Sequence, residues 1–133
     1  MQYPIFIHKD VNSDYGVIVP DLPGCFSAGS SIEEAIENAH EAIECHLEGL
    51  LLDNEPFPLK KPIEQHLDNP EFKDGVLAIV DIDISKISGK TVRVNVSIPE
   101  RFLKQIDEYT HGSNRSGFLV DAALSYMAEH HRA

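Results

Sequence analysis

A short alternating segment in the second half of the chain carries side chains that could read nucleic acid. Positions 92, 94, 96 and 98 are apolar, and Arg93, Asn95 and Ser97 stand between them. Side chains alternate between the two faces of a strand, so the pattern predicts a strand at 91–98 with one apolar and one polar face. Arg, Asn and Ser can hydrogen bond to base edges in the major groove of DNA. The simpler alternative is an amphipathic edge strand whose polar face is hydrated.

A second polar cluster follows Gly112 and precedes an apolar helical pattern; it consists of Ser113, Asn114, Arg115 and Ser116. Free amide groups at a helix N-terminus, with Ser and Arg beside them, form a common phosphate-binding arrangement. Ordinary helix capping by Ser113 or Asn114 explains the same residues. Both roles can hold together.

The first part of the chain contains carboxylates of the kind that a nuclease gathers around two metal ions. The candidates are Asp10, Asp21, Asp81 and Asp83. Asp10 begins a turn and Asp21 lies in a proline-rich loop, whereas hydration explains Asp81 and Asp83 on one strand face equally well. We therefore expect a protein that is not an enzyme and that needs no metal or cofactor.

A helical segment presents a further set of potential metal ligands, which are Glu37, His40, Glu41 and Glu44. Their spacing brings side chains three and four residues apart onto one helix face, where they could hold a metal. Nothing else in the sequence orders the set, and a hydrated acidic helix face is the better interpretation.

The two cysteines, Cys25 and Cys45, are too few for a disulfide framework and lack the spacing of a metal finger. We expect both to be reduced thiols in a cytoplasmic protein. The apolar runs are too short to cross a bilayer, and the start of the chain shows no secretory signal.

The predicted elements of the first part form an α+β module with a helix on one face of a sheet. Strands are predicted at 3–9, 15–20, 25–29 and 75–84. The last strand is apolar enough to lie inside the sheet. Residues 53–75 are rich in turn-forming residues and are predicted to be loop with one short helical turn.

A long helix is predicted to begin after the serine pair Ser30 and Ser31 and to continue to about residue 50. Ser30 with Glu33, or Ser31 with Glu34, fits a capping box. Apolar residues then recur with helical spacing, and glutamates occupy the opposite side.

The second part is predicted to be the strand at 91–98 followed by helices at about 99–110 and 115–130, with a turn between them. One strand and two helices with apolar faces cannot form a stable sheet or core alone. We therefore expect a homodimer in which two copies of the strand pair and the apolar faces are buried.

Charge divides the chain at the same place. The net charge of -11 hides a contrast, because residues 1–87 hold 17 acidic and 5 basic residues while residues 88–133 hold 5 acidic and 6 basic. An acidic first part repels nucleic acid and favours basic protein partners. The sequence therefore predicts two modules, 1–87 and 88–133, with different partners.

Residues 90–127 resemble a ribbon-helix-helix DNA-binding domain. The resemblance rests on an alternating strand that ends in Ile-Pro-Glu at 98–100 and on the Gly-x-x-Arg-Ser turn at 112–116. It implies that Arg93, Asn95 and Ser97 enter the major groove, and that the turn residues 113–116, above all Ser116, hold a phosphate. Gly117 departs from the bulkier residue that this family often has after the serine.

The first module is similar to the HicB antitoxin family. The shared features are the loop Pro-Asp-Leu-Pro-Gly-Cys at 20–25 and the Glu-Glu-Ala start of a helix at 33–35. The resemblance implies a degraded ribonuclease-H-like fold, binding of a HicA-type ribonuclease toxin that cuts mRNA, and repression of the operon that encodes both proteins.

Two surfaces are candidates for the toxin contact: the proline loop or the acidic helix face. Their residues are Asp21, Leu22, Pro23, Gly24, Glu37 and Glu41. We expect homodimers through 91–98, with pairing of dimers into tetramers left open. The alternative is a ribbon-helix-helix regulator without a toxin, whose first module senses a ligand or oligomerises.

Overall fold

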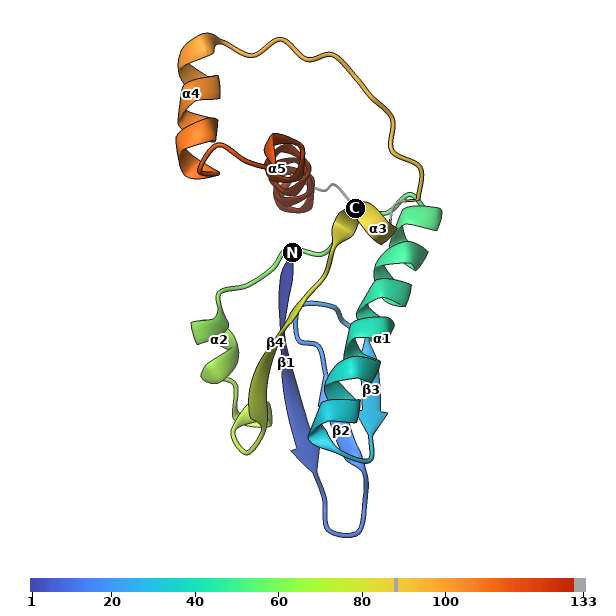
Figure 1. Cartoon of the computed structure of the whole chain (residues 1–133). Coiled ribbons are helices and arrows are strands. Elements are labelled where there is room, and N and C mark those ends of the chain that lie inside the picture. The colour runs from blue at the N-terminus through green and yellow to red at the C-terminus, as the bar shows by residue number, and fades with distance from the viewer. Residues whose placement is uncertain (88, 131–133) are drawn as a thin grey trace.

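The computed structural model describes residues 1–87 and 89–130. Ser88, at which the predicted second module begins, and residues 131–133 lie outside the described residues. The elements, which Figure 1 labels except for η1, are β1 (Gln2–Lys9), β2 (Tyr15–Ile18), β3 (Phe26–Gly29), α1 (Ile32–Leu52), α2 (Ile63–Leu67), η1 (Pro70–Phe72), β4 (Val76–Asp81), α3 (Ile84–Ile87), α4 (Glu100–Tyr109) and α5 (Arg115–Glu129). The predicted α+β class is confirmed.

The four strands form one antiparallel sheet in the order β3-β2-β1-β4. β1 lies inside the sheet, where Phe6 faces Ile18 of β2 on one side and Leu77 of β4 on the other. The prediction that the apolar 75–84 run lies inside the sheet is wrong, because β4 is an edge strand and ends at Asp81. A long apolar run indicates that the faces of a strand are buried, but it does not show whether both edges of the strand are hydrogen bonded.

α1 covers one face of the sheet (Figure 1) and forms the main core. Its buried residues, Ala35, Ala39, Ile43 and Leu47, recur every four positions. They pack with Tyr3, Ile5 and Ile7, the residues of β1 that point to this side. In the part of the chain that the structure describes, no helix is long and apolar enough to cross a membrane.

The start of α1 decides between the two predicted caps. Ser31 is the N-cap, and its hydroxyl accepts a hydrogen bond of 3.1 Å from the Glu34 amide. Ser30 donates instead to the Glu34 carboxylate at 2.8 Å. A Cβ on Gly29 would lie 2.4 Å from the Ala35 nitrogen, so the close approach of β3 to α1 requires glycine there.

The opposite face of the sheet carries a smaller apolar contact made by the segment between α1 and β4. The ring of Phe72 in η1 stacks on Phe6 with 4.5 Å between centroids. α2 lies on the same side in Figure 1, away from α1. The single helical turn predicted within 53–75 is therefore two short turns, α2 and η1, which are held by aromatic stacking.

A buried polar contact fastens the same segment to the loop after β2. Asp21 and His66 are both buried, and His66 Nε2 lies 2.7 Å from Asp21 Oδ1. The Lys61 amide also donates to Asp21 Oδ1, at 3.0 Å. Asp21 Oδ2 is buried and has no hydrogen-bond partner among the described residues. Asp21 therefore connects two loops that lie about 40 residues apart in sequence.

The chain after α3 does not form the predicted strand within a single copy. Residues 91–99 have no regular secondary structure and run as a long unpaired connection to α4 (Figure 1). The predicted helices are confirmed within one or two residues as α4 and α5. A strand is stable only when its backbone groups are paired, and a single chain offers this segment no partner strand.

α5 lies beside the N-terminal part of the molecule. Leu124 packs against the main core. Asp121 acts electrostatically on Lys60, whose ammonium lies 4.9 Å from the Tyr3 ring centroid and donates to the Gln2 carbonyl. Burial lowers the pKa of Lys60, and Asp21 and Asp121 oppose that shift.

Replacement of Asp21 by alanine will destabilise the fold. The change leaves His66 Nε2 and the Lys61 amide without their acceptor, and a buried orphaned polar group costs about 1–3 kcal/mol. We expect a loss of that size in the free energy of unfolding measured by urea denaturation. Asp14→Ala, an exposed carboxylate in the β1–β2 turn, is the control and should change stability by less than about 0.5 kcal/mol. Equal stability of the two variants would contradict a structural role for Asp21.

Candidate nucleic-acid interface and partner-binding surfaces

The segment 91–99 presents residues 91–97 of the predicted strand to solvent, and Ile98 is half-buried. Val92, Val94 and Val96 are 69%, 75% and 65% exposed, and the polar residues Arg93, Asn95 and Ser97 are also exposed. Three β-branched residues on one face carry a high cost when they are left in water. The arrangement brings the three predicted base-reading residues onto a segment that is incomplete without a partner.

Neither helix of the second part has a buried residue in the single chain. The large apolar side chains left exposed there are Phe102, Tyr109, Leu119, Val120, Tyr126 and Met127. The two helices touch through the edge-to-face rings of Tyr109 and Phe118, with centroids 5.5 Å apart. This ring contact leaves most of the apolar surface of the pair open.

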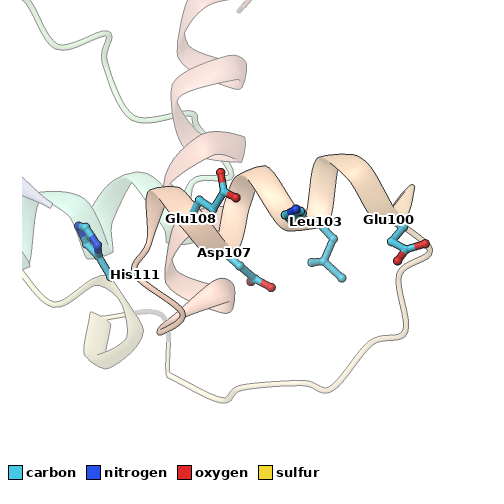
Figure 2. A pocket seen from close by; sticks show the side chains of 6 residues that line it. Glu100, Leu103, Asp107, Glu108 and His111 are labelled. Carbon is cyan, nitrogen blue, oxygen red and sulfur yellow. The ribbon is translucent and has the colours of Figure 1, made fainter.

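A groove of about 630 Å³ runs along α4 (Figure 2). Leu103 lies in its middle, and Glu100, Lys104, Asp107, Glu108 and His111 line the remainder. Leu103 is the apolar residue of this lining, and charged or titratable side chains surround it. Because α4 follows directly on the unpaired segment, one partner could cover both.

The turn between α4 and α5 is fixed by its own side chains. Asn114 is the N-cap of α5 with φ of 57°, and its side chain accepts a 3.1 Å hydrogen bond from the Gly117 amide. This selects Asn114 over Ser113 as the cap. A Cβ on residue 117 would lie 2.4 Å from the Asn114 amide nitrogen. Gly117 therefore leaves room for the asparagine cap, which explains its departure from the family pattern.

Arg115 is held by an ion pair within the same turn. Its Nε and Nη2 donate to the two carboxylate oxygens of Asp107 at 2.7 and 2.6 Å. These bonds keep the pKa of Asp107 below its ordinary value. Because two donors of the guanidinium already point at Asp107, this geometry favours a bracing role for Arg115.

Of the two serines of the turn, one is engaged in a hydrogen bond within the chain and the other is exposed. Ser113 donates its hydroxyl to the Thr110 carbonyl at 3.2 Å. Ser116 is exposed in the first turn of α5, where anions interact favourably with a helix N-terminus. Of the four predicted phosphate ligands, Ser116 has the geometry that fits this role best.

The proline loop divides into buried and exposed residues. Asp21 and Leu22 are buried, so both side chains support the fold and neither can contact a partner in this conformation. Pro23 and Gly24 are exposed. Phe26 follows them in β3 and is 65% exposed. Sequence patterns missed Phe26, because a single aromatic at the start of a short strand gives no signal of exposure.

Phe26 lies on the side of the sheet that α1 does not cover, because it faces Ile18 in the register and stands outside the main core. Glu37 and Glu41 are exposed on the outer side of α1, across the sheet from Phe26. The two predicted contact surfaces are thus on opposite faces of the sheet. A single small partner would occupy one of them.

The predicted nuclease carboxylates do not converge. Asp81 faces Gln2 at one end of β1, and its carboxylate lies 3.5 Å from the Met1 amine. Asp10 follows the other end of β1, and Asp21 is engaged by His66. Within residues 1–87 and 89–130, no group of three potential ligands has a geometry that could hold a metal ion.

The remaining candidate groups have ordinary structural roles. His40 Nδ1 lies 2.5 Å from Glu44 Oε1 one turn along α1. Cys25 is buried, and burial, with a smaller effect of Cys45, raises the pKa of its thiol. A raised pKa disfavours the thiolate, which is the reactive form.

Comparisons with known proteins agree on one family. The family model of the HicB-like antitoxin of bacterial toxin-antitoxin systems matches residues 3–123. A protein of the rep-hol intergenic region of Haemophilus phage HP1 is 47% identical over 131 residues, which cover 96% of this chain and 98% of that protein.

Solved structures give the same result. The crystal structure of the Burkholderia pseudomallei antitoxin HicB has a TM-score of 0.82 and 42% identity, with 96% of this chain and 98% of that chain covered. A chain of the HicA3 and HicB3 toxin-antitoxin complex has a TM-score of 0.54 and 38% identity, over 62% of this chain and 99% of that chain. The sequence match over residues 3–123 and the shared fold show that this chain belongs to the HicB-like antitoxin family.

Proposed function

We propose that this chain represses transcription by binding operator DNA as a dimer of the ribbon-helix-helix type. The observation that carries the proposal is the unpaired segment 91–99, in which Val92, Val94 and Val96 stay exposed beside Arg93 and Asn95. Antiparallel pairing with a second copy buries the valines between the ribbon and the helices. The polar face is then a ribbon narrow enough for the major groove.

The helices α4 and α5 complete this module, for which we propose the limits 88–133. Their open apolar side chains pack against those of the second copy. Ser116 at the start of α5 binds a DNA phosphate, and the Asp107–Arg115 bridge sets the angle of the turn that presents it. Phosphate contacts fix position on the duplex, while ribbon contacts supply sequence preference.

The module 1–87 binds and masks a HicA-type ribonuclease toxin. It holds 17 acidic and 5 basic residues, and this acidic balance suits a basic partner. The solved complex of HicA3 with HicB3, one chain of which resembles this one, supports a toxin of that class. The chain itself contributes no chemistry, since blocking access to the toxin's catalytic surface is sufficient.

The toxin contact is centred on Phe26, with Pro23 and Gly24 beside it. An exposed aromatic ring next to a rigid loop is the kind of residue that dominates interface energies. The acidic side chains on α1, Glu37 and Glu41, lie on the other face and act at long range by attracting a basic protein.

Arg93→Ala and Asn95→Ala will weaken specific operator binding. Each removes hydrogen bonds to a base edge, which are worth about 1–3 kcal/mol of discrimination. Fluorescence anisotropy should show that the affinity for DNA from the chain's own promoter falls roughly tenfold or more and that the affinity for scrambled DNA falls less. Lys86→Ala, in α3, is the control and should bind as the parent does. Normal promoter binding by both ribbon variants would refute the assignment.

Phe26→Ala will weaken toxin binding by about 2 kcal/mol, as expected for the centre of an interface. Isothermal titration calorimetry with the toxin encoded beside this gene measures the change. Val11→Ala, an exposed apolar residue in the β1–β2 turn, is the matched control. If Phe26→Ala leaves the affinity for the toxin unchanged while Glu37→Ala and Glu41→Ala lower it, the contact lies on α1. If the neighbouring gene product never binds, the chain is a regulator without a toxin.

A further inference from the structure

One side of α5 lies against the first part of the same chain. Leu124 and Ala128 are half-buried, and they share this side with Asp121 because the three follow one another at intervals of three and four residues. Leu124 packs against the main core. An opening of about 530 Å³ beside this contact is lined by Leu51, Phe57 and residues of α5. The helix therefore docks on the first part of the chain through a small apolar contact.

A charged contact lies beside this packing. Lys60, in the segment between α1 and α2, is half-buried and donates to the Gln2 carbonyl, and its ammonium lies 4.9 Å from the Tyr3 ring centroid. Burial lowers the pKa of Lys60, whereas the charges of Asp21 and Asp121 raise it. Burial, Asp21 and Asp121 also raise the pKa of the Tyr3 hydroxyl. Asp121 of α5 is therefore close enough to Lys60 for the two charges to attract each other.

The opposite side of α5 faces solvent. Leu119, Ala122 and Tyr126 are exposed, and with 3.6 residues per turn they lie across the helix axis from Leu124 and Ala128. The proposed dimer covers this exposed side with the second copy. Docking and dimerisation therefore use different sides of α5, so both contacts can hold at the same time.

The docked side of α5 decides where the acidic part of the chain lies. Figure 1 shows α5 between the sheet and the segment 91–99. α3 ends at Ile87, so the connection to the predicted strand spans at most about 14 Å, and it keeps the 17 acidic residues of 1–87 near the ribbon. When α5 is docked, a helix about 10–12 Å in diameter separates the two. This thickness exceeds the Debye length of about 8 Å at physiological salt.

We propose that Lys60 is a positioning residue for operator binding: its attraction to Asp121, together with the packing of Leu124, holds the acidic part of the chain on the side of α5 that faces away from DNA. The inference rests on the proposed function, since it concerns the DNA complex that the ribbon forms. Without the contact, the acidic part turns on its short connection and approaches the DNA phosphates, which it repels. Lys60 touches no DNA and acts through α5.

The test is the affinity of the full-length chain for DNA from its own promoter, measured by fluorescence anisotropy at low salt. Lys60→Gln and Asp121→Asn should each weaken binding about two- to fivefold, the range expected for one ion pair near the surface. The double variant should lose no more than one single variant does, because both changes remove the same contact. Lys60→Arg keeps the charge and should bind as the parent does. Lys61→Gln, which removes the same charge from the exposed neighbouring lysine, is the control and should also bind as the parent does.

The direction of the Asp121→Asn effect separates this role from simple charge repulsion. Removal of a carboxylate that has no docking role should leave binding to DNA unchanged or strengthen it. Parent-like or tighter binding by Asp121→Asn therefore overturns the positioning role of Lys60, whatever Lys60→Gln does. Additive losses in the double variant overturn it as well, since the two residues then act independently. If the parent itself does not bind its promoter, the proposed function is wrong, and the role of Lys60 falls with it.

Discussion

The structure depends on the burial of β1 from four sides. Its backbone is bonded to β2 on one edge and to β4 on the other. Its odd-numbered side chains, such as Ile5, enter the main core beneath α1, and Phe6 on the reverse face stacks on Phe72. Pro4 also fits this arrangement, since its nitrogen points past the end of β2, which pairs with β1 only from Phe6 onward. β2 and β4 bond to this strand directly, and η1 reaches it through Phe72.

The second part of the chain, in contrast, leaves its apolar residues exposed in a single copy. In a single copy it buries none of the residues of α4 and α5 and leaves the valines of 91–99 in water. The groove along α4 shows the same incompleteness. In the proposed function this part gains its stability from association, so its folding and its association are one equilibrium. The proposal therefore implies that operator binding depends strongly on protein concentration.

Division of labour within the chain follows from charge and burial together. The acidic surface of residues 1–87 suits a basic protein and repels DNA, while the polar face of 91–97 lies on a nearly neutral part of the chain. Asp21 belongs to the acidic count but not to the acidic surface, because it is enclosed with His66 and joins two loops. Net charge therefore favours a basic protein as the partner of residues 1–87, and burial decides which residues such a partner can touch.

Sequence by itself determined most of the helices and strands, because local periodicity and capping depend on neighbours in the chain; the strand predicted at 91–98 does not form in a single copy. It placed α1, α4, α5 and the four strands within a few residues, and it gave two choices for each of two caps, of which Ser31 and Asn114 are the ones used. Only the tertiary structure decided what depends on distant residues. An apolar run has the same pattern in a central strand and in an edge strand, so sequence could not show that β4 lies at the edge of the sheet. The Asp21–His66 bond and the Asp107–Arg115 bridge join residues whose spacing has no local signature. The exposure of Phe26 depends on which face of the sheet α1 covers.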